Sequence, residues 1–346
     1  MRVTGRAREL FKRVAFASGA LGRYQKVRNR NTLTVVMFHR VLAADDERWA
    51  HADPRYTMTE DQLEQCIEFF GKHYSFVDLA AVKAAARRVQ ALPARALLVT
   101  FDDGWADTEE YALPVLRRRR CPAAVFVVSS AVGASHGFWQ ERIVRAWRGG
   151  ADPGALVSAW RHAGIDADPP PENWQSSDSV RRLIARLRPL VPSARLALVE
   201  QLEGEAPTGR PEMLTHDQLR SLHRAGIAIG AHGVTHEALA ETACGTGELR
   251  ESKAQLSELL DGAPIETMSF PHGSYDGELL RAAAADFELV FTSDGCLNAV
   301  DEGRPPTVLG RIEIPAEAIV GTAGEVRPEL LALWLFRRSH ATVATV

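Results

Sequence analysis

Several features that would assign this chain to a particular class of protein are missing from its sequence. The four cysteines lie far apart and form no CxxC pair, which argues against a zinc–thiolate site and against a dense disulfide framework. Neither sign of charge dominates, since the formal net charge is −3, so the overall balance does not indicate a nucleic-acid partner. The scattered cysteines instead favour a reducing compartment.

The N-terminal segment, residues 1–30, is the exception to this balance. It carries nine lysines and arginines but only one acidic residue, Glu9. Its apolar runs are too short to cross a bilayer or to form the core of a signal peptide. A basic helix with an apolar stripe could contact an anionic membrane surface, whereas the alternative is a solvated tail or a helix packed on the domain. The stripe would consist of Leu10, Phe11, Val14 and Leu21. We expect a cytoplasmic protein, with peripheral contact to the inner membrane face left open.

An ordinary globular composition remains, and 346 residues are enough to bury a large core. Short β-like runs recur along the chain and are separated by helical patterns. Capping-box signatures that begin at Thr59 and Thr215 predict the start of two helices. Strands that alternate with helices predict an α/β fold with a parallel sheet, and seven or eight such units favour a barrel. The β-like runs are residues 33–39, 76–79, 96–103, 123–129, 227–232, 267–271, 287–292 and 311–314.

One stretch, residues 135–212, interrupts this alternation with helical patterns and no convincing strand. We interpret it as a helical insertion on the barrel. It contains four tryptophans and a proline-rich turn at residues 168–171, and the tryptophans form either the small core of the insertion or a sugar-stacking surface. The tryptophans are Trp139, Trp147, Trp160 and Trp174. The expected organisation is a basic helical segment at 1–30, a barrel at 31–320 and a C-terminal tail at 321–346.

Adjacent carboxylates end one of the predicted strands, in the sequence VTFDDG at residues 99–104. Asp102 and Asp103 would repel each other and lose hydration at the end of a buried strand. A metal ion is the first candidate to offset that cost.

Two histidines follow another predicted strand, in the sequence GAHGVTH at residues 230–236. If the chain turned into a helix there, one turn would bring His232 and His236 to the same side. Two imidazoles and a carboxylate suit zinc or another divalent transition metal. Both motifs lie at carboxyl ends of strands, which is the end that carries the chemistry in parallel barrels.

The second carboxylate, Asp102, is then available for another role. Metal-assisted hydrolysis needs a base that takes a proton from water and an acid that protonates the leaving group. A carboxylate next to a metal ligand is well placed as the base. The alternative is that Asp102 caps the following turn.

These motifs, together with a strand that ends in FPHG at residues 270–273, resemble the polysaccharide deacetylases of the NodB-homology type. The resemblance covers roughly residues 33–315. It implies a distorted (β/α)7 TIM-like barrel, removal of N-acetyl or related acyl groups from amino sugars of a glycan, and a divalent metal, with zinc expected before cobalt or nickel. It places Asp103, His232 and His236 on the metal and makes Asp102 the base.

The general acid of the family usually lies near the C-terminal end, where no matching motif occurs. The first strand instead ends in His39, which is similar to the circularly permuted branch that includes exopolysaccharide deacetylases. This resemblance makes His39 the acid. It also implies oxyanion or substrate contacts at Pro271, His272 and, less directly, Arg311.

Two departures from the family pattern leave alternatives open. Ser269 stands where an arginine often orients the base, and Arg311 could replace that arginine by position. The tryptophan of the family's fourth motif is not recognisable near residues 293–295. The alternative functions are a catalytically weak glycan-binding or envelope-assembly protein, and a metal phosphohydrolase, although the phosphatase pattern DxDxT is absent.

Overall fold

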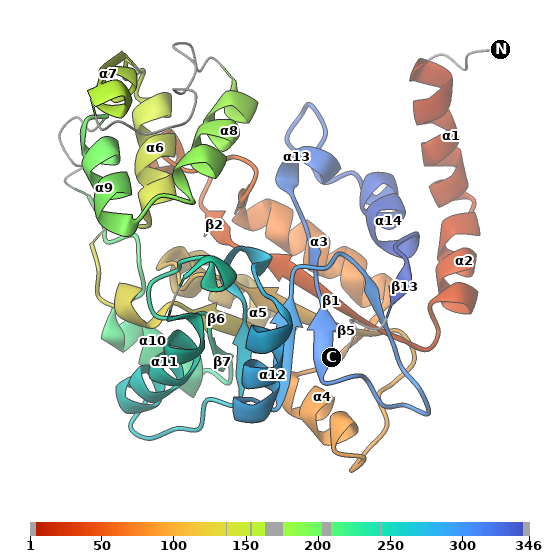
Figure 1. The fold of residues 1–346 in the computed structure, drawn as a ribbon. Coiled ribbons are helices and arrows are strands. Elements are labelled where there is room, and N and C mark those ends of the chain that lie inside the picture. The colour runs from red at the N-terminus through yellow and green to blue at the C-terminus, as the bar shows by residue number, and fades with distance from the viewer. Residues whose placement is uncertain are drawn as a thin grey trace.

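A curved, mostly parallel β-sheet forms the centre of the molecule (Figure 1). The computed structural model describes residues 5–135, 137–152, 154–162, 176–202, 209–242 and 244–341. The sheet order is β11-β9-β8-β7-β6-β5-β1, and every neighbouring pair in this series is parallel. These strands are β1 (Thr32–Phe38), β5 (Ala96–Phe101), β6 (Ala123–Val127), β7 (Ala228–Ala231), β8 (Thr267–Ser269), β9 (Leu289–Thr292) and β11 (Val308–Gly310).

The sheet curls until its two ends meet. Strand β11 pairs with β9 at one end, whereas β12 (Ile312–Glu313), one residue further along the chain, pairs with β1 at the other. Arg311 lies between β11 and β12, at the irregular seam where the curl closes. The prediction of an α/β fold with a distorted barrel is confirmed. Shorter strands complete the set: β2 (Arg40–Leu42), β3 (Thr57–Thr59), β4 (Ser75–Phe76), β10 (Leu297–Ala299) and β13 (His340–Ala341).

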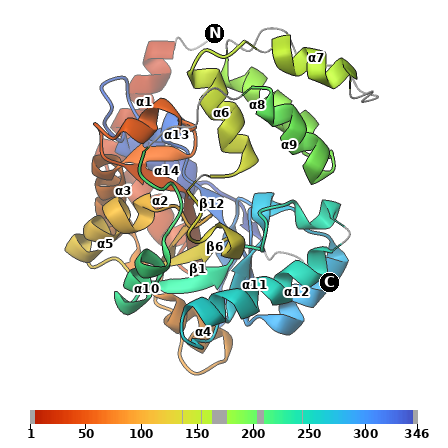
Figure 2. The same ribbon diagram turned by 90° about the vertical axis from the view of Figure 1, so that its left-hand side faces the viewer.

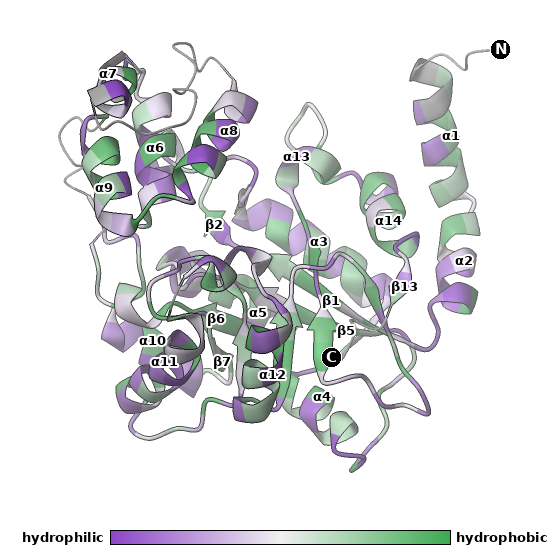
Figure 3. Cartoon of the chain, in the orientation of Figure 1, coloured by the Kyte–Doolittle hydropathy of each residue, from purple (hydrophilic) through white to green (hydrophobic). Residues whose placement is uncertain are grey.

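Both faces of the central strands are apolar, as expected for a parallel sheet covered on both sides (Figure 3). Alternate residues enter two separate clusters: Leu98 belongs to the cluster inside the curl, and Val99 to the cluster under the outer helices. Phe126 on β6 and Phe291 on β9 lie 4.9 Å apart between ring centroids, although two strands separate them in the sheet. The inside of the curl is therefore packed, and the chemistry is confined to its rim.

Helices cover the outside of the barrel, and both capping-box predictions are confirmed. Thr59 and Thr215 each accept a hydrogen bond from the third residue of the following helix and donate one back to its side chain. Helix α10 ends at Arg224, two residues before Gly226. The outer helices are α3 (Glu60–His73), α5 (Leu113–Arg119), α10 (His216–Arg224), α11 (Gly245–Leu259) and α12 (Gly277–Asp286), whereas α4 (Leu79–Ala86) packs against the cluster inside the curl.

The helical insertion stands over the rim of the barrel (Figures 1 and 2). Trp139 and Trp160 are buried in its small core and Trp147 packs against that core, so the structural interpretation of these tryptophans is confirmed. Trp174 and the turn at 168–171 lie outside the described residues. The helices of the insertion are α6 (Trp139–Arg148), α7 (Gly154–His162), α8 (Ser177–Leu187) and α9 (Pro192–Glu200).

The first and last helices of the described chain pack together. Helices α1 (Gly5–Ala17) and α2 (Ala20–Arg28) pack on α14 (Pro328–Phe336), which follows the short α13 (Ala316–Ile319). Within the stretch expected as a C-terminal tail, the described residues up to 341 form α14, which buries apolar side chains, and β13, which joins the sheet beside β10. No helix in the described part of the chain has both the length and the apolar character needed to cross a membrane.

Candidate metal and catalytic site

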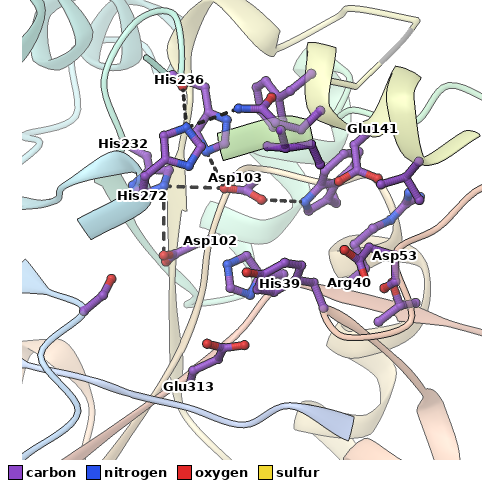
Figure 4. Close-up of a pocket in the computed structure, with 18 of the residues that line it drawn as sticks. His39, Arg40, Asp53, Asp102, Asp103, Glu141, His232, His236, His272 and Glu313 are labelled. Atoms are coloured by element: carbon purple, nitrogen blue, oxygen red, sulfur yellow. Dashed lines mark hydrogen bonds and ion pairs between the residues drawn. The ribbon is translucent and has the colours of Figure 1, made fainter. Parts of the chain in front are cut away.

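The functional residues expected from the sequence gather at one end of the barrel (Figure 4). Asp102 and Asp103 directly follow β5, His39 directly follows β1, and His232 directly follows β7. All of these strands are parallel, so their carboxyl ends share one rim. The fold therefore brings together motifs that lie far apart in the sequence.

Three of these side chains form a compact donor set for a metal. The Nε2 atoms of His236 and His232 lie 3.2 and 3.4 Å from Oδ1 of Asp103. Ligand atoms bound tetrahedrally at 2.0–2.1 Å would lie about 3.4 Å from one another, so this spacing suits zinc. All three residues are buried, and their ligand atoms lie within 4.8 Å of one another. The burial and proximity of these donors are consistent with a divalent metal site.

A hydrogen bond at Nδ1 of His232 leaves its other ring nitrogen, Nε2, available for a metal. Its Nδ1 lies 2.9 Å from the backbone carbonyl oxygen of Ser269, which can only accept a hydrogen bond. Nδ1 must therefore carry a proton, which leaves Nε2, the atom that faces Asp103, as the nitrogen that would bind a metal. A histidine ligand whose other nitrogen donates to a carbonyl is typical of metal sites.

The turn from His232 to His236 is a loop, so the helical explanation of this spacing is wrong. Gly233 and His236 have positive φ angles of 73° and 61°, which a right-handed helix cannot contain. The carboxylate of Glu248 holds the loop by accepting hydrogen bonds from the backbone N–H groups of Val234 (3.0 Å) and Thr235 (3.1 Å). A side chain on the next α-helix, α11, therefore shapes this loop.

Three of the eight non-glycine residues with a positive φ angle in the described chain lie at the same rim. Asp103, His236 and His272 all have left-handed φ angles, of 78°, 61° and 56°. Such conformations are uncommon outside glycine and persist where the surrounding structure enforces them. The fold thus stabilises three strained residues around one point.

Asp102 forms a buried ion pair with Arg311. The guanidinium donates from Nη1 to Oδ1 at 2.6 Å and from Nη2 to Oδ2 at 2.7 Å, and Nη2 also donates to Oγ of Ser269 at 2.5 Å. Burial opposes ionisation of the carboxyl, but the charge and hydrogen bonds of Arg311 together with the nearby His232 and His39 outweigh it and hold the pKa of Asp102 below its usual value. Asp102 is therefore a carboxylate at neutral pH.

Arg311 is not placed to contact a substrate in the cavity. Its side chain is fully buried, and its remaining bonds go to the carbonyl oxygen of Thr292 and the hydroxyl of Thr100. It does not line the cavity, so we place it with Asp102 and no longer among the substrate residues. Ser269 stands where the family often has an arginine. Its hydroxyl oxygen accepts a hydrogen bond from Arg311.

The other predicted residues lie around the metal ligands. His39 lines the cavity, with its ring 4.9 Å from that of Tyr56, on the side of Asp102 (Figure 4). Nε2 of His272 donates to the carbonyl oxygen of His236 at 3.0 Å, and burial lowers the pKa of His272 to about 3, so the ring is neutral. Pro271 is buried and begins the short turn that presents His272.

A cavity of about 390 Å³ opens over these residues, within the usual range for small-ligand sites. The insertion supplies one wall, which sequence reasoning did not predict because no motif marks it. Burial raises the pKa of Glu141 in this wall to about 8, so this carboxyl is mostly protonated at pH 7. The residues of the wall are Phe138, Gln140, Glu141, Val144, Arg181, Ile184, Ala185 and Arg188.

Comparison with solved structures shows the same fold in several deacetylases. The Streptococcus pyogenes deacetylase PplD in complex with acetate aligns with a TM-score of 0.54 and 17% identity, over 88% of this chain and 99% of that chain. IcaB from Ammonifex degensii aligns at 0.53 and 19%, over 88% and 97%. A de-N-acetylase from Aggregatibacter actinomycetemcomitans aligns at 0.52 and 16%, over 81% and 94%.

Sequence comparison identifies the family directly. No protein with a curated function matches the chain in sequence. A profile described as polysaccharide deacetylase matches residues 90–290, which include both aspartates, both candidate histidine ligands and the turn at His272. Because this match spans more than half of the sequence, the chain belongs to the polysaccharide deacetylase family.

Proposed function

We propose that this protein hydrolyses N-acetyl groups from amino sugars of a glycan with the help of a divalent metal, most suitably zinc. The observation that carries the proposal is the Asp103–His232–His236 donor set beside a carboxylate, Asp102, that is held ionised by Arg311. A binding protein would not need that combination of metal ligands and oriented base.

Different residues of this chain carry out the separate steps of the hydrolysis. A bound metal would polarise the amide carbonyl and lower the pKa of a water molecule to about 7. Asp102 accepts a proton from the water as its oxygen attacks the carbonyl carbon. A backbone N–H at the His272 turn stabilises the oxyanion. His39 donates a proton to the amide nitrogen as the C–N bond breaks, which releases acetate and a free amino sugar.

The proposal is tested by measuring metal content and acetate release on the purified chain with N-acetylglucosamine oligomers. We expect about one equivalent of metal, loss of acetate release after chelation, and recovery when zinc is returned. Asp103→Asn should lose both metal and activity. Asp217→Asn, a matched change at a side chain that is 98% exposed, should lose neither.

Two results would contradict the proposal. Acetate release that survives complete chelation would exclude the metal-dependent reaction. Stoichiometric metal without acetate release from any N-acetylated glycan would favour the alternative of a glycan-binding or envelope-assembly protein.

A further inference from the structure

The indole of Trp105 is fixed in one orientation beside the proposed metal ligand Asp103. Trp105 is 1% exposed, the guanidinium carbon of Arg40 lies 4.2 Å from its ring centroid, and Phe138 meets its ring edge-on at 5.5 Å. A Cβ atom at Gly137 would lie 2.7 Å from the indole, so glycine is needed for this close approach. The ring therefore has no room to turn.

The two carboxylate oxygens of Asp103 have different partners: Oδ2 contacts the indole and Oδ1 contacts the histidines. Nε1 of Trp105 donates a hydrogen bond to Oδ2 at 2.9 Å. The other oxygen, Oδ1, is the atom that lies 3.4 and 3.2 Å from the Nε2 atoms of His232 and His236. A carboxylate with one oxygen occupied in this way presents a single oxygen to a metal.

The guanidinium that packs on the indole ring, that of Arg40, is itself fixed by buried acidic residues. Arg40 is 2% exposed and donates from Nε to the carboxylate of Asp107 at 3.0 Å, while its Nη1 lies 3.9 Å from Glu212. The backbone N–H of Val41 also donates to Asp107, at 3.0 Å. Arg40 is thus fixed to the barrel through Asp107. Its cation–π contact with Trp105 therefore restrains the indole as well.

We propose that Trp105 is a positioning residue that holds Asp103 as a one-oxygen ligand of the metal. This inference rests on the metal site of the proposed function. Groups that hydrogen-bond to metal ligands fix ligand orientation, and their loss typically weakens metal affinity about 10- to 100-fold. Trp105 directly follows the TFDDG motif, and no role was expected for it from the sequence.

The test compares zinc affinity, measured by competition with a chelating dye, in the wild-type chain and in Trp105→Phe. We expect the zinc Kd to rise about 10- to 100-fold and the visible absorption of bound Co²⁺ to change, because Asp103 can then rotate. Trp139→Phe is the matched control: it alters another buried tryptophan under an arginine, 4.5 Å from Arg195, in the core of the insertion and outside the cavity lining. Its zinc affinity and cobalt spectrum should match those of the wild type.

Replacement of Trp105 by 3-benzothienylalanine, which exchanges the N–H group for sulfur with little change of shape, separates the hydrogen bond from packing. It should reproduce the loss of zinc affinity even if Trp105→Phe fails to fold. Wild-type zinc affinity in this folded variant would overturn the inference. Absence of zinc binding by the wild type would instead refute the proposed function.

A second, independent observation concerns the surface of α1 and α2. Nine large apolar side chains are exposed on the described part of the chain, and five of them lie on these two helices, with exposures of 43–82%. Figure 3 shows apolar positions along α1, on the opposite side of the molecule from the insertion. The five residues are Leu10, Phe11, Val14, Tyr24 and Val27.

The inward face of the same helices is already occupied. Phe16 stacks on Phe69 at 6.2 Å, and Leu21, expected in the outer stripe, packs on the barrel core instead. The exposed residues therefore cannot be buried by a small rotation of α1.

The charge around this apolar surface is positive. Arg13, Arg23, Lys26 and Arg30 are exposed. The single acid of residues 1–30, Glu9, is paired with Lys12 and Arg327, both at 2.6 Å. Exposed apolar side chains flanked by basic ones match the surface of an anionic bilayer, where each basic residue adds attraction and each apolar one inserts below the headgroups.

We infer that α1 and α2 dock this protein on an anionic lipid membrane. The full chain should sediment with vesicles of phosphatidylcholine and phosphatidylglycerol and not with phosphatidylcholine alone. Phe11→Asp should weaken binding at least about tenfold, and Lys26→Gln about fivefold. Val89→Asp, at a valine that is 76% exposed beyond α4, is the matched control and should bind like the wild type.

Unchanged vesicle binding in Phe11→Asp would overturn this inference, as would failure of the wild type to bind anionic vesicles. A wild-type dimer that becomes a monomer in Phe11→Asp without lipid would assign the surface to a second copy of the chain, which also overturns it.

Discussion

Asp102→Asn is expected to lower kcat for acetate release by about 10²- to 10⁴-fold while the metal stays bound. Positioned general bases contribute rate factors of this size, and asparagine cannot accept the proton from water. The ligand atoms on Asp103, His232 and His236 are untouched by the change. The measurement is kcat together with metal stoichiometry on the same preparation.

The comparison with Asp103→Asn makes this prediction specific. Both variants exchange a carboxylate for an amide in adjacent residues, but only Asp103→Asn should release the metal. Wild-type turnover in Asp102→Asn would remove Asp102 from the mechanism. Loss of metal in Asp102→Asn would mean that this residue is a ligand, which its 3.9 Å separation from Nε2 of His232 and its pairing with Arg311 argue against.

The second large effect is expected from Arg311→Met, which should lower the free energy of unfolding by about 3–5 kcal/mol. The substitution leaves the carboxylate of Asp102 buried without its cation, and the cost of that charge exceeds the loss of the hydrogen bonds alone. Urea denaturation at neutral pH measures the difference. Arg118→Met, which removes an exposed partner of Glu64, should cost about 0–1 kcal/mol.

The cost of Arg311→Met should also depend on pH. In the wild type the pKa of Asp102 is held low, so the pair stabilises the fold above the ordinary pKa of aspartate and is lost as the pH falls through the folded value. In the variant, burial is no longer opposed by Arg311, so the pKa of Asp102 rises and this carboxyl becomes neutral at a higher pH than in the wild type. The difference in stability should therefore shrink as the pH falls. A pH-independent difference would assign the effect to packing.

Much of the barrel was predictable because its signals are local. Buried strands read as apolar runs, and the capping boxes at Thr59 and Thr215 each lie within four residues. The candidate metal ligands were predictable for a related reason. Asp103 and His232 follow apolar runs directly, so a parallel sheet had to bring them to one rim.

The partner of Asp102 was suggested only by position. Arg311 lies 209 residues further along the chain, and its bidentate contact depends on how the sheet closes between β11 and β12. The loop from His232 to His236 was misjudged because its shape also depends on a tertiary contact. Its spacing permits a helix, but Glu248 on α11 holds it as a left-handed turn.

The sequence by itself therefore determined the fold class, the family and the types of group at the rim, since each depends on short patterns that survive without context. Tertiary structure alone decided that Arg311 neutralises Asp102, that Trp105 holds one oxygen of Asp103, and that the insertion walls the cavity. These features are contacts between distant segments. Their geometry follows from the packing of the whole barrel, which no local pattern encodes.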